Sequence, residues 1–223
     1  VLEPLITADS LEGQIEELTN MLAVEAATPT TLVGHSYGAW LCMMVAGRSP
    51  NLVEKLVLVS SGALTAEGTS DIESERRSRL NEEERHESER LGLDFDSATP
   101  EEKERIWLRY GQLCLKSDSY HLVDSPNEIL SGGAAIFQAV WPEVAILRDS
   151  GKLLQMAKRV SCPVVVIHGD YDPQPVAGVA QPLETVIKDF HCTILANCGH
   201  IPWVEHDAQS EFYAVLAREI SAT

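Results

Sequence analysis

The feature that most constrains the fold is the stretch TTLVGHSYGAWLCMMVA at residues 30–46. Residues 31–33 are short and β-favouring, which predicts a strand. Residues 39–46 are apolar on every face and predict a buried helix. That helix should end before the following Ser-Pro pair, because the residue before a proline avoids helical backbone angles. Ser36 is therefore expected at a sharp corner between a strand and a helix.

Strands and helices alternate along both flanks of the chain. Continuous apolar runs predict buried strands at residues 55–62 and 162–170 and, more weakly, at 191–199. Apolar residues at helical spacing predict helices at about residues 9–27 and 207–220. This alternation favours an α/β fold built on a mostly parallel sheet.

Two details of the flanking helices can be checked against the structure. Asp9 and Glu12 have the spacing of a capping pair at the start of the first helix. In the last helix, the residues expected to face inward are Phe212, Val215, Leu216 and Ile220.

Residues 63–160 interrupt the alternation with helical patterns only. Helices are predicted at residues 99–115, 125–147 and 150–160. A helical insertion of this length between two sheet strands is typical of a lid over a site. The predicted organisation is thus a core at residues 1–62 and 161–223 with a helical cap at residues 63–160.

The first part of this insertion, residues 67–90, is almost wholly charged. It contains two acid–base pairs at i, i+4 helical spacing, Glu73 with Arg77 and Glu75 with Arg79. We interpret the run as a solvated helical face.

Composition narrows the possible partners and the compartment. The formal net charge of −17 argues against nucleic acid or an anionic membrane surface, and favours a neutral or cationic small-molecule substrate. The apolar runs are too short for a membrane span. The five cysteines are odd in number and lack C-x-x-C spacing, so we expect reduced thiols, a cytoplasmic location and no structural zinc site.

Gly34-His35-Ser36-Tyr37-Gly38 fits the pattern G-x-S-x-G. A nucleophilic serine on a strand-to-helix corner has strained backbone angles, and side chains two residues before and after it are expected to collide. The corner also points a helix N-terminus at the hydroxyl, where developing negative charge is stabilised. The pattern therefore predicts that Ser36 is a nucleophile.

A serine nucleophile needs a base, and the base needs an orienting carboxylate. Asp170 and Asp172 follow one predicted strand, and His200 follows the next. The chain order is then Ser, Asp, His, and all three lie in loops after strands, where such sites form.

Six other histidines are assigned no catalytic role. We expect His35 and His168, which lie near the corner, to be packing or polar-shell residues. The other four show no metal-ligand spacing: His86, His121, His191 and His206.

Together, GHSYGA, PVVVIHGDYDP and CGHIPWVEH resemble the α/β-hydrolase family, particularly its lid-bearing members. The resemblance covers about residues 1–62 and 161–223. It implies that Asp172 is the orienting acid, with Asp170 as the alternative, and that His200 is the base. It also implies that the Tyr37 backbone N–H is one oxyanion donor, and that no metal or organic cofactor is required.

The chain departs from the family near its start. Only about thirty residues precede Ser36, so we expect this sequence to lack the family's first three or four strands and the loop with the second oxyanion donor. The nucleophile's strand should then be an exposed edge that allows self-association. We expect a fragment of a longer polypeptide; a partner chain that completes the sheet and a shortened variant are the alternatives.

The leading functional hypothesis is a serine hydrolase that cleaves a small ester, thioester or amide through an acyl-enzyme. A serine nucleophile argues against the family's dehalogenase and epoxide-hydrolase branches, and the lid and acidic composition are distantly similar to proline iminopeptidases. The alternatives are a non-catalytic ligand-binding or sensor protein on the same scaffold, or an inactive fragment of a longer hydrolase.

Overall fold

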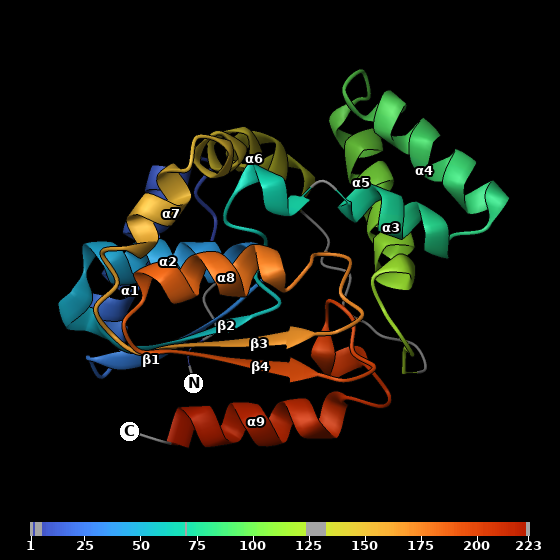
Figure 1. Cartoon of the computed structure of the whole chain (residues 1–223). Helices are drawn as coiled ribbons and strands as arrows, with labels where there is room; N and C mark the ends of the chain where they lie inside the picture. Colours follow the sequence, from blue (N-terminus) through green and yellow to red (C-terminus); the bar gives the residue numbers. More distant parts are fainter. Residues whose placement is uncertain (1, 3–5, 70, 124–132, 222–223) are drawn as a thin grey trace.

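The computed structural model describes residues 2, 6–69, 71–123 and 133–221, and its centre is a four-stranded sheet with helices on both faces (Figure 1). The strands are parallel and lie in the order β1-β2-β3-β4. Their bounds are β1 Thr30–His35, β2 Val53–Val59, β3 Val164–Gly169 and β4 Phe190–Leu195. The predicted α/β class with a parallel sheet is confirmed.

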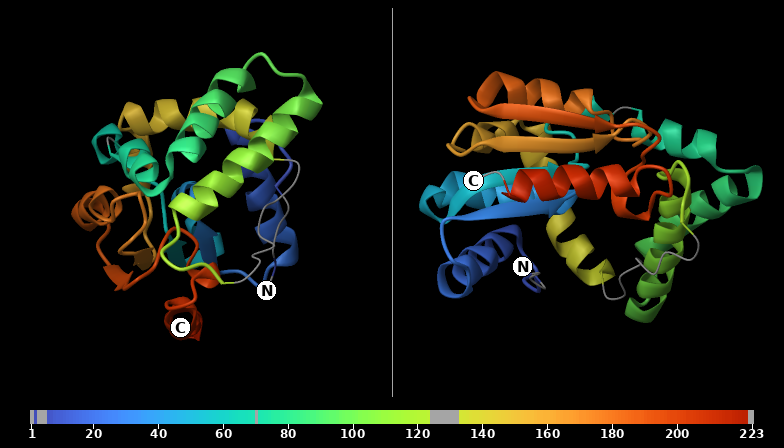
Figure 2. Two further views of the ribbon diagram at one scale, coloured as in Figure 1. Left: turned by 90° about the vertical axis from the view of Figure 1, so that its right-hand side faces the viewer. Right: turned by 90° about the horizontal axis from the view of Figure 1, so that it is seen from below.

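Alternate residues of the central strands enter two different apolar cores. On one face, Leu56 and Val164 pack beneath α1 Leu11–Glu25, α2 Tyr37–Arg48 and α8 Ala177–Val186. On the other face, Val57 and Val165 pack against α9 Gln209–Ser221. Figure 2 shows α9 lying across the sheet in the view from below. Both central strands are buried on both faces, as their continuous apolar runs predict.

In the described part of the chain, β1 pairs with another strand on one side only. Its Val33 lies in the same row as Val57 and Val165, yet 44% of Val33 is exposed whereas Val57 is fully buried. The strand that leads to Ser36 is therefore an edge strand with one uncovered apolar position.

Three details of the helices differ from the expectations. The cap of α1 is Ser10, whose hydroxyl accepts from Gly13 N–H at 3.2 Å, so the prediction of Asp9 was wrong. Ile220 is 44% exposed, because Glu219 takes the inward position of the last turn of α9 and binds Lys55 at 3.0 Å. Helix α8, which contains Pro182, was not predicted.

The inserted segment forms two groups of helices. The first group, which we call the outer helices, lies beyond the carboxyl ends of the strands (Figure 1). It comprises α3 Ile72–Arg79, α4 Glu82–Phe95 and α5 Pro100–Ser117, and α5 begins with a capping box at Thr99.

The second group is α6 Ala134–Asp149 and α7 Lys152–Ala157. Val144 and Leu153 of these helices are fully buried in the same core as α2. The predicted helix 125–147 matches α6 from Ala134 onward, and its earlier part lies outside the described residues. The division into core and cap at residues 63–160 stays a prediction.

Candidate active site

Ser36 occupies the corner between β1 and α2 with φ 52° and ψ −119°. A positive φ in a residue with a side chain is strained and persists only where the surroundings hold it. Here Ser36 N–H donates to the Val59 carbonyl at 3.0 Å, which ties the corner to the neighbouring strand. The structure thus has the strained strand-to-helix turn that the G-x-S-x-G pattern predicts.

The two glycines of the pattern differ in whether the structure leaves room for a side chain. A Cβ on Gly34 would lie 2.4 Å from the Gly38 carbonyl oxygen, so any side chain there would collide with backbone. A Cβ on Gly38 would meet no atom within 4 Å. The expectation of a steric collision at both positions was therefore wrong for Gly38, which contributes its backbone to the crowding at Gly34.

Ser36, His200 and Asp172 form a hydrogen-bonded row. His200 Nε2 lies 3.0 Å from Ser36 Oγ, and His200 Nδ1 lies 2.8 Å from Asp172 Oδ2. Each side chain comes from a loop at the carboxyl end of a parallel strand, and these ends meet at one edge of the sheet. The structure brings together the three residues that the sequence singled out.

Asp172 is buried and both of its carboxylate oxygens have donors. Oδ1 accepts from Gln174 N–H at 2.9 Å and Oδ2 faces His200. Burial alone would raise the pKa of Asp172, but the charge and hydrogen bond of His200 outweigh it and hold that pKa below its usual value. Asp170 is exposed and accepts from Cys198 N–H at 3.2 Å, an arrangement that fits a loop-holding role.

The pKa of His200 is shifted in the direction that suits a base paired with a carboxylate. Burial alone would lower the pKa, but the Asp172 charge and hydrogen bond outweigh burial and raise it above the ordinary value. An imidazolium formed during a reaction would thus be stabilised by Asp172.

The backbone of His200 is held from both sides. Its N–H donates to the Asp118 carbonyl at 2.8 Å, and its carbonyl lies 2.8 Å from His35 Nε2. Burial lowers the pKa of His35 to about 3, so its ring is neutral and donates the Nε2 proton. His35 also packs edge-on against Trp203 at 4.7 Å between ring centroids. The role expected for His35, a polar and packing residue around the corner, agrees with these contacts.

His168 is buried beside Asp172. Its Nε2 lies 2.8 Å from the Gln174 carbonyl and 3.5 Å from Asp172 Oδ2, and burial lowers its pKa. The ring is therefore neutral and donates to Gln174, which leaves His200 as the nearest hydrogen-bond partner of Asp172 among the histidines.

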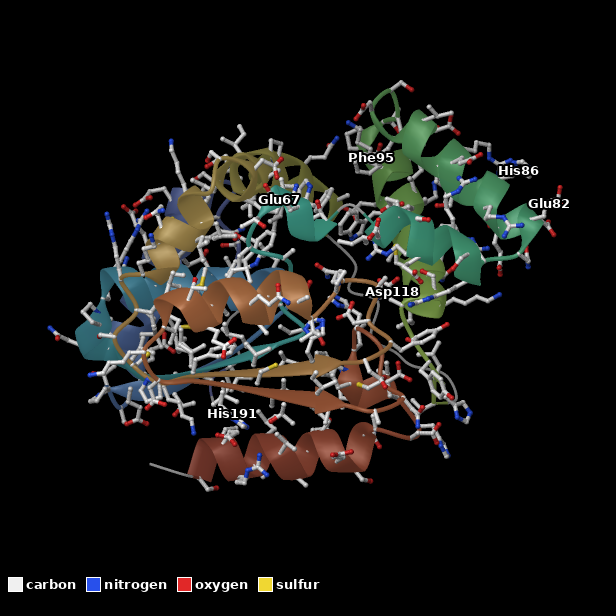
Figure 3. The ribbon with its side chains drawn as sticks, viewed as in Figure 1. Glu67, Glu82, His86, Phe95, Asp118 and His191 are labelled. Carbon is white, nitrogen blue, oxygen red and sulfur yellow. The ribbon has the colours of Figure 1, made fainter. Side chains whose placement is uncertain are left out.

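Two arginines of α3 contact residues next to the Ser36–His200–Asp172 row: Asp118, whose carbonyl accepts the His200 N–H, and Tyr171, which precedes Asp172. Arg76 makes a two-pronged ion pair with Asp118, with its Nε 2.9 Å from Oδ1 and its Nη2 2.7 Å from Oδ2. Arg79 donates to the Ser117 and Tyr171 carbonyls and lies over the Tyr171 ring at 3.8 Å. Figure 3 shows Asp118 between the outer helices and the strand ends.

These contacts correct the interpretation of residues 67–90 as a solvated face. Of the two predicted i, i+4 pairs, Glu75–Arg79 is present at 3.4 Å, whereas Arg77 pairs with Glu89 of α4 instead of Glu73. Figure 3 shows His86 and Glu82 on the outer side of α4, where the interpretation holds. Sequence spacing records neighbours along one helix, so it gave no signal of partners 42 and 92 residues away.

The first turn of α2 supplies the candidate oxyanion donor. Tyr37 is the first residue of α2, so its N–H has no acceptor within the helix. The Tyr37 hydroxyl donates to Gln14 Oε1 at 2.7 Å and ties this turn to α1. The assignment of the Tyr37 N–H to an oxyanion stays a prediction.

No helix among the described residues is long and apolar enough to cross a membrane. The described cysteines are all unpaired, and two of them, Cys42 and Cys198, are buried.

Solved structures of similar fold were found by comparison with known proteins. A solved structure named VinJ is 19% identical, with a TM-score of 0.67, over 95% of this chain and 72% of that one. Proline iminopeptidase from Mycobacterium smegmatis is 20% identical, with a TM-score of 0.59, over 95% and 71% of the two chains. At these identities the likeness concerns the fold alone.

A biotin biosynthesis bifunctional protein, BioHC of Teredinibacter turnerae, is 21% identical over 201 residues. The match covers 89% of this chain but only 34% of that protein, so the chain spans about a third of its length. The model of the "Alpha/beta hydrolase family" matches residues 4–214, which is nearly the whole chain. The chain therefore belongs to the alpha/beta hydrolase family.

Proposed function

We propose that the protein is a serine hydrolase that cleaves an ester, thioester or amide of a small substrate. The observation that carries this proposal is the row Ser36–His200–Asp172, with separations of 3.0 and 2.8 Å. A hydroxyl within reach of a neutral imidazole, which is in turn oriented by a buried carboxylate, is the arrangement that activates a serine.

The reaction would proceed in two stages. Ser36 Oγ attacks the substrate carbonyl carbon while His200 Nε2 takes the hydroxyl proton, and Asp172 stabilises the resulting imidazolium. The Tyr37 N–H donates to the oxyanion at the start of α2. His200 then returns the proton to the leaving group, which departs and leaves an acyl group on Ser36. Water, deprotonated by His200, hydrolyses this ester and restores the free hydroxyl.

The substrate class follows from charge and family. The net charge of −17 disfavours anionic substrates at long range, which favours neutral or cationic ones. The fold is shared with a solved structure whose name, proline iminopeptidase, describes a peptidase. Small neutral esters and aminoacyl amides are therefore the first substrates to test.

A labelling and turnover experiment tests the proposal. The chain is treated with a fluorophosphonate probe and separately assayed with p-nitrophenyl acetate, thioesters and aminoacyl amides. We expect labelling and turnover in the wild type and loss of both in Ser36→Ala. Ser97→Ala is the matched control, because Ser97 lies beyond α4, far in sequence from the row, and its hydroxyl donates only to a nearby carbonyl.

The other outcomes separate the alternatives. Ligand binding in the substrate panel without labelling or turnover would indicate a binding or sensor protein. A folded wild-type chain that shows neither labelling nor binding would contradict the hydrolase proposal for this chain. Turnover that survives in Ser36→Ala would show that another group performs the reaction.

A further inference from the structure

Two exposed histidines and an aspartate meet on the surface near the loop that carries His200. His121 Nδ1 lies 3.1 Å from Asp207 Oδ2, and His206 Nδ1 lies 2.9 Å from Asp207 Oδ1. One potential ligand atom from each residue lies within 4.8 Å of the other two. The side chains are 40–65% exposed, so an ion in solution can reach all three.

The cluster is built from two segments that are paired like strands. His206 N–H donates to the His121 carbonyl at 2.7 Å, and Val123 N–H donates to the Val204 carbonyl at 2.9 Å. Between these bonds, Leu122 and Glu205 form an antiparallel bridge. The pairing places the His121 and His206 rings on the same side, with centroids 4.7 Å apart. The spacing of the two histidines is thus set by backbone hydrogen bonds rather than by flexible side chains alone.

The buried side chain of Glu205 also holds together the two segments that carry His121 and His206. Its side chain is buried, and its carboxylate accepts the N–H groups of Tyr120, His121 and Gly199 at 2.8–2.9 Å. Three donors to one buried carboxylate make a rigid support. The histidines therefore project from backbone that is fixed before any ligand binds, which lowers the entropic cost of binding.

We propose that His121, His206 and Asp207 form a binding site for a divalent transition-metal ion of the Zn²⁺ type. Two imidazole nitrogens and one carboxylate oxygen suit Zn²⁺, Ni²⁺ or Cu²⁺ better than Mg²⁺ or Ca²⁺, which prefer oxygen ligands alone. Ligands with bonds of about 2.0–2.1 Å to a tetrahedral ion lie about 3.4 Å apart. His121 and His206 now face different oxygens of Asp207, at 3.1 and 2.9 Å, and the three ligand atoms lie within 4.8 Å of one another. Rotation of these exposed side chains would bring the ligand atoms to the tetrahedral spacing.

Binding would exchange one set of contacts for another. In each neutral imidazole the proton now on Nδ1 would move to Nε2 by exchange with solvent, and the metal would take its place between Nδ1 and Asp207. Water would complete the coordination on the open side. The ion would then join the segment after α5 to the segment that follows His200, and stabilise the pairing of these two parts of the chain.

The test uses Zn²⁺ and Co²⁺ with the whole chain lacking a histidine tag. Calorimetric titration with Zn²⁺ should show one saturable site in the wild type. We expect affinity to fall at least tenfold in His121→Ala, His206→Ala and Asp207→Asn, because each change removes one ligand. His86→Ala and His191→Ala are matched controls, since each removes an exposed histidine outside the cluster and should leave affinity unchanged.

Two further measurements locate the ion. Saturating Zn²⁺ should raise the Tm of the wild type and both controls, but not that of the His121→Ala/His206→Ala double variant. The Co²⁺ complex should lack the strong near-ultraviolet band of thiolate ligation. The absence of a saturable site, equal affinity in the double variant, or a thiolate band would overturn the proposal. Binding that is lost only in His200→Ala would likewise overturn it, by placing the ion at the catalytic row.

Discussion

His200 is the residue whose protonation state governs the proposed reaction. Only the neutral imidazole can take the Ser36 proton, and the Asp172 carboxylate raises the pKa of His200 above its ordinary value. The activity should therefore fall as the pH drops through this raised pKa. The acidic limb of the rate profile should lie above the pH expected for an unperturbed imidazole.

Replacement of Asp172 by Asn tests this electrostatic link. The change removes the charge that raises the pKa of His200, so the acidic limb should move to lower pH. The rate should also fall, by about 10⁴-fold, because the imidazole loses its preferred tautomer. The measurement is kcat/KM against pH with p-nitrophenyl acetate. Asp170→Asn is the control and should leave the limb in place; a shift in Asp170→Asn but not in Asp172→Asn would show that the acid was assigned to the wrong aspartate.

The glycines of the corner give a second residue-scale prediction. Gly34→Ala should lower the free energy of unfolding by at least about 1–3 kcal/mol, because its methyl group would collide with the Gly38 backbone. Gly38→Ala should leave stability unchanged or slightly raised, because space is open there and alanine favours the helix. Urea unfolding of both variants checks the pair. Equal losses in the two variants would argue against the steric explanation.

At the scale of single elements, α3 is the helix whose contacts with the rest of the chain the sequence did not predict. Its Arg79 contacts Tyr171 in the loop that carries Asp172, and its Arg76 binds Asp118 at the end of α5. The Asp118 carbonyl also accepts the His200 N–H. A shift of α3 relative to Asp118 would therefore change the position of His200. Polar contacts of α3 thus link the outer helices to the loop that carries Asp172 and, through Asp118, to the His200 backbone.

Arg76→Met should therefore affect both stability and rate. It leaves the Asp118 carboxylate buried without its cation, which costs about 2–3 kcal/mol of unfolding free energy. We expect kcat to fall while labelling of Ser36 persists more slowly. Arg77→Met is the matched control, since Arg77 is half-exposed and pairs only across the surface with Glu89, so its loss should be within about 0.5 kcal/mol.

A double variant separates the ion pair from other effects of Arg76. Asp118→Asn in the Arg76→Met background removes the unpaired charge and should recover part of the lost stability. Urea unfolding and esterase kinetics of the single and double variants are the measurements. No recovery in the double variant would show that Arg76 acts through something other than Asp118.

At the scale of the whole molecule, β1 leaves one side of the sheet unpaired within the described residues. Edge strands with exposed apolar side chains tend to pair with other chains, and Val33 is such a side chain. We predict that the chain self-associates through β1 and that Val33→Lys weakens this association. Val24→Lys is the control, because Val24 is 82% exposed but lies on helix α1 and not on the edge strand. Sedimentation velocity would reveal a concentration-independent monomer if the prediction is wrong.

The fold and the Ser36–His200–Asp172 row were largely predictable from local patterns. Apolar runs identified all four strands, and the two-glycine pattern located Ser36 at a corner. The row followed because parallel strands end at a common edge, so loops after successive strands must meet there. Resemblance to a family then chose Asp172 over Asp170, and the structure places Asp172 beside His200.

By itself, the sequence determined which segments become strands and helices, because the buried face of one element appears as a periodic pattern of apolar residues within that element. Contacts between segments that are distant in the sequence produce no such pattern. Only the tertiary structure decided that Arg76 reaches Asp118, that Glu219 displaces Ile220 from the core, and that His121 meets His206. Each of these depends on how separate elements are packed and paired, since charged and polar side chains look solvated until their partners are known.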